Sequence, residues 1–489
     1  MATRGPNDLS VAILGAGFSG LAMGRELRLR GFEDFTIYEK AGDVGGTWRE
    51  NTYPGVACDV PSHLYSFKGR PNPNWSERFS GGGEIQDYVK DCAAAFGLTS
   101  HLQFGKKAVR ANHDGTCWHL TFEDGTQTTA TVLISGIGGL HVPQLPDITG
   151  REAFTGSAFH TAQWDHSVSL TGKRVAIIGS AASAIQVAPK IAPKVASLDI
   201  YQRTPNYILP RGNYAYSDFV KSLLARVPVL QSLYRGFIFN LLDLRFPVFH
   251  AGENFMKRLA RREFEQFLTR EIPDPQLRAK LTPNYPLGCK RILVSDDYYK
   301  TLAADHVTLV TDPIAQMTET GVVSGKAHER PADVIIYATG FRTFDLTDAI
   351  QVTNQHGHLL ADRWPHGPAA HKTLSVETFP DLYFLLGPNS ALGHSSVVLM
   401  IEAQARYVGE LLSKMRKTEI RQVSPNRFVA KQYDDRLQHQ LEDRVWAGGC
   451  KSWYVNEHGR NFTLYPGSVR AYFRDLRTVD LRDYDFQSP

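Results

Sequence analysis

Three glycines near the start of the chain have a spacing that suits phosphate binding. Gly15, Gly17 and Gly20 form a G-x-G-x-x-G pattern directly after the apolar run Val11–Leu14. When such a turn joins a strand to a helix, backbone N–H groups and the positive helix end face a pyrophosphate, so nearby side chains must be minimal. A second expected strand ends at Glu39, whose carboxylate can bind a ribose diol. The pattern predicts an adenine dinucleotide site; the alternative is a glycine turn that only permits close packing.

The same pattern returns later in the chain, with one change of charge. An apolar run over residues 175–178 precedes Gly179, and Arg203 lies as far beyond Gly179 as Glu39 lies beyond Gly15. An arginine cannot accept a hydrogen bond from a ribose diol, but it pairs with a 2′-phosphate. We therefore expect FAD at the first turn and NADPH at the second, unless Arg203 is only a solvated cation. The residues expected at the NADPH site are Gly179, Ser180, Ser183, Arg203 and Thr204.

Two alanines weaken this prediction for the second turn. Ala181 and Ala184 occupy positions where the first turn has glycines, and each adds a methyl group near the expected pyrophosphate. Weak or vestigial NADPH binding is therefore an open alternative.

The elements that must position these turns are strands alternating with helices. Further apolar runs at 131–135 and 333–337 each precede a glycine-containing or alanine-containing turn, as expected for strands that close a parallel sheet. The predicted fold class is α/β, with two Rossmann-like dinucleotide-binding domains. The predicted parts are an FAD domain at 1–145, an NADPH domain at 146–335 with a helical insertion at about 213–283, and a return to the FAD domain with the C-terminal region at 336–489.

Composition excludes several other classes of protein. Lys plus Arg total 54 against 50 Asp plus Glu, without long basic runs, so we expect no nucleic-acid partner. We recognise neither a secretory signal nor an uninterrupted apolar stretch of about 18 residues, which predicts a cytoplasmic protein. The apolar stretch at 234–249 could attach to a membrane surface, although packing against the core is favoured. No protein partner is implied.

The cysteines do not suggest metal or dithiol chemistry. They include no Cys-x-x-Cys pair, so no metal site is predicted and reduced thiols are expected. The five are Cys58, Cys92, Cys117, Cys289 and Cys450.

The segment between the two turns carries a more specific pattern. Residues 154–165 read FTGSAFHTAQWD, which matches F-x-G-x-x-x-H-x-x-x-W-[PD] at every specified position. The chain thereby resembles the type I Baeyer-Villiger monooxygenases, within the flavin-containing monooxygenase superfamily, over nearly its whole length. The resemblance implies that His160 and Trp164 couple domain movement to catalysis; from the residues alone, His160 is favoured as a packed loop residue. Other matching segments are 45–48, 53–55, 58–59, 338–341 and 452–454.

The resemblance also implies roles for individual residues. Arg291 is expected to reach the flavin and to be held by Asp59, while Lys290 joins Arg203 at the 2′-phosphate of NADPH. Trp453 is expected to contact the NADP ribose. Without the resemblance, a surface ion pair would be favoured for Arg291. The residues assigned to FAD are Gly15, Gly17, Ser19, Gly20, Glu39, Gly46, Thr47, Trp48, Asp59, Tyr65, Val109 and Arg291.

Together these residues predict an NADPH-dependent flavoprotein monooxygenase. NADPH would reduce FAD, and O2 is the expected acceptor because no cysteine pair can take the electrons. A C4a-peroxyflavin would then add to a ketone and give an ester or lactone, with Arg291 stabilising the anionic charge. The alternatives are oxidation of nitrogen or sulfur in an amine or thioether, and an FAD-binding redox protein that has lost NADPH use.

One loop departs from the ketone-oxidising pattern. Residues 387–396 look more like the wider superfamily, and this loop is expected to shape the substrate pocket. His394 within it is favoured as a packed residue over a catalytic base.

Overall fold

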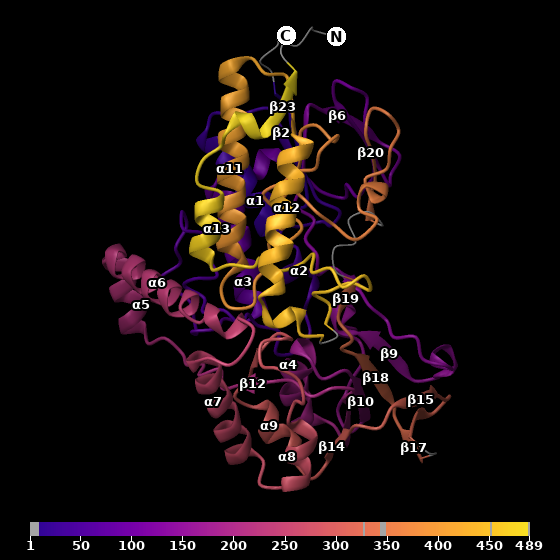
Figure 1. The fold of residues 1–489 in the computed structure, drawn as a ribbon. Coiled ribbons are helices and arrows are strands. Elements are labelled where there is room, and N and C mark those ends of the chain that lie inside the picture. Colours follow the sequence, from indigo (N-terminus) through magenta and orange to yellow (C-terminus); the bar gives the residue numbers. More distant parts are fainter. Residues whose placement is uncertain (1–8, 326–327, 343–348, 450–451, 488–489) are drawn as a thin grey trace.

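A computed structural model describes residues 9–325, 328–342, 349–449 and 452–487. Two five-stranded parallel sheets, one in the upper and one in the lower half of Figure 1, organise the chain. The α/β class predicted from the sequence is therefore confirmed. The prediction that Cys450 has a reduced thiol falls on a residue outside the described ranges.

The first sheet has the strand order β21-β7-β1-β2-β3, with every neighbour parallel. Alternate residues of β1 serve two cores, because Val11 and Ile13 belong to one buried cluster and Ala12 and Leu14 to another. Covered on both faces, the strand is apolar throughout, as the run of four apolar residues predicts. The strands are β1 Val11–Leu14, β2 Phe35–Tyr38, β3 Leu102–Gln103, β7 Val132–Ser135 and β21 Leu382–Phe384.

The second sheet repeats this arrangement in the order β14-β11-β10-β18-β9, again all parallel. In both sheets the strand before the glycine turn is central and the following strand lies beside it. The outermost strand β9 ends at His160, so the fingerprint segment forms a sheet edge. The strands are β9 Ser157–His160, β10 Arg174–Ile178, β11 Ser197–Tyr201, β14 Val307–Val310 and β18 Val334–Tyr337.

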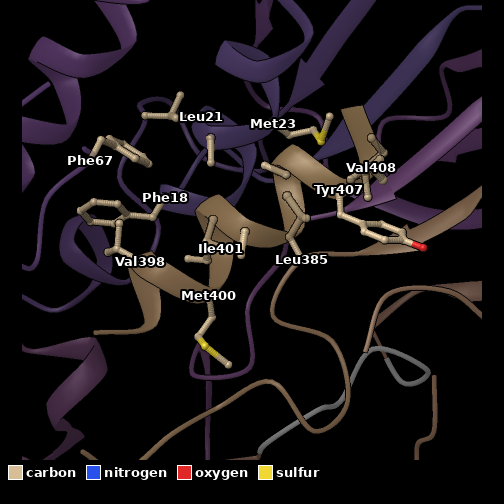
Figure 2. Packing of buried hydrophobic residues seen from close by; sticks show 14 of the residues in the cluster. Phe18, Leu21, Met23, Phe67, Leu385, Val398, Met400, Ile401, Tyr407 and Val408 are labelled. Carbon is tan, nitrogen blue, oxygen red and sulfur yellow. The ribbon is translucent and has the colours of Figure 1, made fainter. Parts of the chain in front are cut away.

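Two helices far apart in sequence cover one face of the first sheet. Helix α1 (Phe18–Leu29) packs against α11 (Val397–Thr418), and Figure 2 shows Leu21 and Met23 of α1 near Ile401 and Val408 of α11. Burying each such side chain contributes about 1.5–3 kcal/mol. This packing, together with the pairing of β21 with β7, joins the C-terminal part of the chain to the N-terminal sheet.

A four-stranded sheet with the order β20-β4-β5-β6 covers the opposite face of the first sheet. Trp118, Leu120 and Phe122 alternate along β5 and point into the shared core, as a half-buried strand requires. The strands are β4 Ala108–His113, β5 Trp118–Phe122, β6 Gln127–Ala130 and β20 Gln351–Thr353.

Four helices lie where the sequence predicts an insertion. They are α5 Asp218–Arg226, α6 Pro228–Asp243, α7 Phe255–Glu271 and α8 Pro275–Leu281. Helices α5 and α6 project from the body of the molecule (Figure 1). Ile238 of α6 is buried, whereas Leu233 and Phe237 are 65% and 62% exposed, so this stretch packs against the core on one side only. None of the helices among the described residues has the length and apolar character needed to cross a membrane. The domain boundaries stay a prediction.

Shorter elements connect these layers. The remaining helices are α2 Thr47–Glu50, α3 Gly82–Ala95, α4 Ala182–Ile191, α9 Tyr298–Leu302, α12 Arg427–Glu442 and α13 Val469–Asp475. The remaining strands are β8 Val142–Pro143, β12 Ile208–Leu209, β13 Leu293–Val294, β15 Ile314–Met317, β16 Gly321–Ser324, β17 His328–Pro331, β19 Phe341–Arg342, β22 Gln422–Pro425 and β23 Tyr484–Gln487. The 3₁₀ helices are η1 Thr99–His101, η2 Arg151–Ala153, η3 Thr161–Gln163, η4 Ala192–Lys194, η5 Phe246–Phe249, η6 Ala361–Arg363, η7 Val445–Ala447 and η8 Leu481–Asp483.

The thiols differ from the sequence-based expectation at one position. Cys289 is disulfide-bonded, so the prediction that all five cysteines are reduced is wrong. Composition and spacing could not reveal this bond, because it depends on which distant residues the fold brings together.

Candidate active site

The first glycine turn is closed so tightly that side chains are excluded from it. A Cβ atom on Gly20 would lie 1.9 Å from the Gly15 carbonyl oxygen, and one on Gly15 would lie 2.8 Å from the Gly136 carbonyl oxygen. Gly17 precedes the first residue of α1, so the turn leads directly into the helix N-terminus. Backbone N–H groups and the helix dipole are therefore available to an anion, and this turn fits the pyrophosphate of FAD.

Glu39 directly follows β2, and its contact with a ribose stays a prediction. Strands β1 and β2 end side by side, and the buried Glu39 carboxylate accepts hydrogen bonds from Ala16 N at 2.7 Å and Ala41 N at 2.9 Å. An ionised carboxylate has about four lone-pair sites, so these two bonds leave acceptor capacity for a diol.

Most of the other residues assigned to FAD lie in α1, in and around α2, and in β4. Gly46 directly precedes α2 and lies close to Gly17, because a Cβ atom on Gly46 would lie 3.3 Å from Gly17 Cα. Trp48 in α2 donates a hydrogen bond from Nε1 to the Tyr65 hydroxyl at 3.1 Å. Thr47 is the first residue of this helix, and Ser19 is buried within α1. Val109 lies in β4, and its contact with FAD stays a prediction.

The second turn also contains a glycine that a side chain would obstruct, and its two alanines differ in burial. A Cβ atom on Gly179 would lie 2.3 Å from the Ala338 carbonyl oxygen, so this glycine is needed to close the turn. Ala184 is fully buried among apolar residues of the second core, so its methyl group packs away from the turn surface. Ala181 remains exposed at the start of α4. The effect of either alanine on NADPH binding stays a prediction.

Two cations stand near each other at the predicted 2′-phosphate site. Burial lowers the pKa of Lys290, and the positive charge of Arg203 lowers it further. The Lys290 ammonium lies 4.7 Å from the centre of the Tyr285 ring. Two neighbouring positive charges suit a dianionic phosphate, which would relieve their repulsion.

Arg291 and Asp59 come together across 232 positions of sequence. The guanidinium donates to Asp59 Oδ2 from Nε at 3.0 Å and from Nη2 at 2.6 Å. The negative charge of Asp59 raises the pKa of Arg291, and burial acts in the opposite direction. Both side chains keep about one third of their surface exposed, at 33% and 30%. Arg291 is thus a fixed cation that can still be reached by a ligand.

The surroundings of this pair remain protonated near neutral pH. Burial raises the pKa of Cys58 and Tyr65, and the Asp59 charge adds to the effect on both. Burial also raises the pKa of Tyr454 to about 12, against the opposing charge of Arg291. Cys58, Tyr65 and Tyr454 are therefore expected to stay uncharged, and none of them neutralises Arg291.

A seam between the two dinucleotide units holds the pair in place. Gln186 of α4 accepts from the Tyr53 hydroxyl at 2.9 Å and donates to Ala57 O at 3.0 Å. Gly55 lies between these contacts with φ +85°, and a Cβ atom there would lie 2.5 Å from Gln186 O. The segment leading to Asp59 is thus docked on the helix that starts at the second turn.

Comparisons with known proteins agree with this geometry. The family model described as flavin-binding monooxygenase-like matches residues 8–365. The chain belongs to the flavin-binding monooxygenase-like family. A protein of Pseudomonas aeruginosa named Baeyer-Villiger monooxygenase is 44% identical, covering 97% of this chain and 90% of its own. A protein of the same name from Streptomyces coelicolor is 40% identical, covering 98% and 93%.

Solved structures of two monooxygenases share the fold of this chain. The closed crystal structure of cyclohexanone monooxygenase has a TM-score of 0.88 at 24% identity, covering 98% of this chain and 99% of that one. Oxidized steroid monooxygenase bound to NADP has a TM-score of 0.86 at 26% identity, covering 98% and 100%.

Several residues that matter to this family member's site gave no signal in the sequence. Arg211 donates from Nη2 to Cys58 O at 2.6 Å, and Asp296 accepts from the Arg211 N–H at 2.9 Å. Arg211 therefore links the Lys290–Arg291 side of the site to the Asp59 segment. Gln186 was missed in the same way, since neither residue type nor spacing distinguishes it from other helix residues.

Two histidines singled out in the sequence have packed positions. His160 is buried, and its Nδ1 accepts from Ala162 N at 3.1 Å; burial lowers its pKa. His394 is buried against Phe246, with ring centres 5.3 Å apart, and its Nε2 lies 3.5 Å from Asp243 Oδ1. These contacts agree with the packed interpretation of both residues.

Trp164 of the fingerprint segment and Trp453 near the C-terminal end differ in their surroundings. Trp164 packs edge-on against Phe159, with ring centres 5.1 Å apart. Trp453 is 43% exposed and packs against Tyr454, the neighbour of Arg291. The expected contacts of Trp453 with a ribose and the coupling role of Trp164 stay predictions.

Proposed function

We propose that this protein is an NADPH-dependent Baeyer-Villiger monooxygenase that uses FAD and O2 to convert an apolar ketone into an ester or lactone. The observation that carries the proposal is the Arg291–Asp59 pair at the seam of two dinucleotide units. Relatives that are 44% and 40% identical carry the name of this activity.

The residues that fit the cofactors have separate tasks. The Gly15–Gly20 turn and Glu39 would hold the pyrophosphate and ribose of FAD, and Arg203 and Lys290 would hold the 2′-phosphate of NADPH. When bound, NADPH supplies the hydride and FAD supplies the oxygen activation, two kinds of chemistry that the protein's own side chains cannot perform.

Arg291 would stabilise the negative charge that develops when an oxygen nucleophile adds to the ketone carbonyl. A guanidinium is suited to this task because it stays protonated and offers several fixed donors. Asp59 occupies the Nε and Nη2 donors, which fixes the plane of the group and leaves other N–H donors for the reacting oxygen. Because the Arg291 guanidinium is oriented before the reaction, it does not have to reorganise when negative charge develops on the substrate.

An aromatic and apolar cluster would form the ketone side of the site. Phe246, Phe249, Trp446 and Tyr454 pack together with Leu464, and Tyr454 lies beside Arg291. Such a wall excludes water, which strengthens the interaction of Arg291 with a developing oxyanion. It would favour ketones with apolar substituents.

The proposal is tested by following flavin absorbance and products. Anaerobic NADPH should bleach the flavin much faster than NADH, and O2 with a cyclic ketone should then restore the oxidised spectrum and yield a lactone. A parallel reaction with a thioether distinguishes the alternative chemistry. Sulfoxide formation without any ester or lactone from a panel of ketones would contradict the proposal, as would flavin that NADPH does not bleach.

A further inference from the structure

Three side chains with metal-binding atoms gather at a surface turn outside the predicted active site. Asp114, Cys117 and His119 each present one ligand atom, and these atoms all lie within 4.8 Å of one another. Asp114 Oδ2 lies 2.6 Å from His119 Nε2 and 3.7 Å from Cys117 Sγ, and Sγ lies 3.6 Å from Nε2. Asp114 and His119 are exposed and Cys117 is half-buried.

The local fold explains this convergence. The turn joins β4 to β5, and His113 pairs with Trp118 across it. Successive residues of a strand point to opposite faces, so the fully buried Trp118 places its neighbours Cys117 and His119 together on the outer face. The anchored tryptophan fixes the direction of both potential ligands.

Asp114 is held with one oxygen turned toward the other two groups. Its Oδ1 accepts from Thr116 N at 2.7 Å, Thr116 Oγ1 at 2.7 Å and Cys117 N at 2.9 Å. Oδ2 is the oxygen that faces Cys117 and His119. The carboxylate is therefore oriented before a metal binds, which reduces the entropy lost on binding.

We propose that Asp114, Cys117 and His119 bind Zn²⁺, with water as the fourth ligand. Zn–ligand bonds of about 2.0–2.3 Å place neighbouring ligand atoms of a tetrahedron roughly 3.3–3.7 Å apart. The two separations that involve Cys117 Sγ already match this range. The Asp114–His119 separation is that of a hydrogen bond and would widen when the metal replaces the shared proton.

The ligand types select the metal. Thiolate and imidazole are soft or borderline ligands that favour Zn²⁺ over Mg²⁺ and Ca²⁺, which prefer sets of oxygen atoms. The three ligands follow an Asp-x-x-Cys-x-His spacing, which contains no Cys-x-x-Cys pair.

The bound ion would stabilise the sheet that covers the first parallel sheet. Gln422 of β22 donates from Nε2 to Gly115 O at 2.9 Å, so the turn also anchors the C-terminal strand pair. A metal that binds only the folded turn stabilises the protein by mass action. The site is separate from Arg291, and the inference does not depend on the proposed oxygenation.

The test uses the flavin-loaded protein after treatment with a chelator, and Co²⁺ serves as a spectroscopic probe. One equivalent of Co²⁺ should produce a thiolate-to-cobalt charge-transfer band that Zn²⁺ abolishes. Cys117→Ser should remove this band, and His119→Gln should weaken Zn²⁺ binding by at least about 10- to 100-fold, the loss typical even of supporting residues. Flavin absorbance should be unchanged in both variants, which shows that they are folded.

His439→Gln is the matched control, because His439 is an exposed histidine beside a carboxylate, Glu442, at 3.2 Å. This variant should keep the band and the Zn²⁺ affinity of the parent. The inference is overturned if no charge-transfer band forms, if the band survives Cys117→Ser, or if Zn²⁺ affinity is unchanged in His119→Gln.

Discussion

Arg291 directs two of its N–H donors, Nε and Nη2, to the single oxygen Oδ2 of Asp59, at 3.0 and 2.6 Å. Asp59 lies in the chain between β2 and β3 of the first sheet, and Arg291 lies in the chain between β11 and β14 of the second sheet. The fold therefore assembles this charged centre from segments that lie 232 positions apart, and several predictions depend on this relationship.

Replacing Arg291 should remove oxygenation without removing the flavin. Loss of one preorganised electrostatic group typically lowers kcat by about 10² to 10³, so we expect a loss of this size in Arg291→Ala, measured by product formation with a ketone. Flavin content and its reduction by NADPH should be retained. Arg482→Ala is the control, because Arg482 also pairs with an aspartate, Asp480, but lies at the surface. A ketone oxidation rate equal to that of the parent would remove Arg291 from the mechanism.

Arg203 and Lys290 should determine the preference for NADPH over NADH. A hydrogen bond to a charged group contributes about 1.5–3 kcal/mol, so each alanine variant should raise KM for NADPH about 10- to 100-fold. KM for NADH should change little, because NADH lacks the 2′-phosphate. Lys173→Ala, at the opposite end of β10, is the control. An equal rise in KM for NADPH and for NADH would argue against a contact of Arg203 or Lys290 with the 2′-phosphate.

The NADPH affinity should also depend on pH in a defined direction. The pKa of Lys290 is lowered by burial and by the charge of Arg203, so Lys290 loses its proton at a lower pH than an ordinary lysine. KM for NADPH should therefore rise as the pH increases, beginning below the usual lysine range, while KM for NADH stays flat. Lys290→Arg, whose guanidinium does not titrate, should remove this rise. A rise that persists in the arginine variant would point to another group.

Gly55 should be intolerant of a side chain. Gly55→Ala combines φ +85° with a Cβ atom 2.5 Å from Gln186 O, so the segment must move away from α4. We expect a loss of about 1–3 kcal/mol in the free energy of unfolding, together with slower flavin reduction by NADPH. Gly105→Ala is the matched control, because Gly105 also has positive φ (+69°) but has nothing within 4 Å of its Cβ position. Equal losses in the two variants, measured by urea unfolding, would show that backbone strain alone is responsible.

Restoring glycine at position 184 should not improve NADPH binding. Ala184 is buried in the core beneath the turn, so Ala184→Gly removes a packed methyl group and adds backbone freedom to a helix. The expected cost is about 1–2 kcal/mol of stability, with KM for NADPH unchanged. Ala94→Gly, at an exposed position in α3, isolates the helix propensity effect. A lower KM for NADPH in Ala184→Gly would mean that this methyl group does obstruct the nucleotide.

Local pattern was enough to predict the α/β class and the two repeated turns. Each turn depends on residues that are close in sequence, because a strand, a glycine and a helix start must follow one another within a few positions. The charge difference between Glu39 and Arg203 is likewise visible from spacing alone. These features follow from short-range backbone geometry, which the order of residues specifies directly.

The tertiary structure decided what depends on long-range contact. Arg291 meets Asp59, and Gln186 bridges Tyr53 and Ala57, only because segments far apart in the sequence pack against each other. Ala184 is buried only because α4 packs into the second core. Sequence spacing carries no information on such long-range contacts, since the chain between the two partners can fold in many ways. What the sequence determined was therefore which groups are present and which turns they form; packing determined which of those groups meet and how far water can reach them.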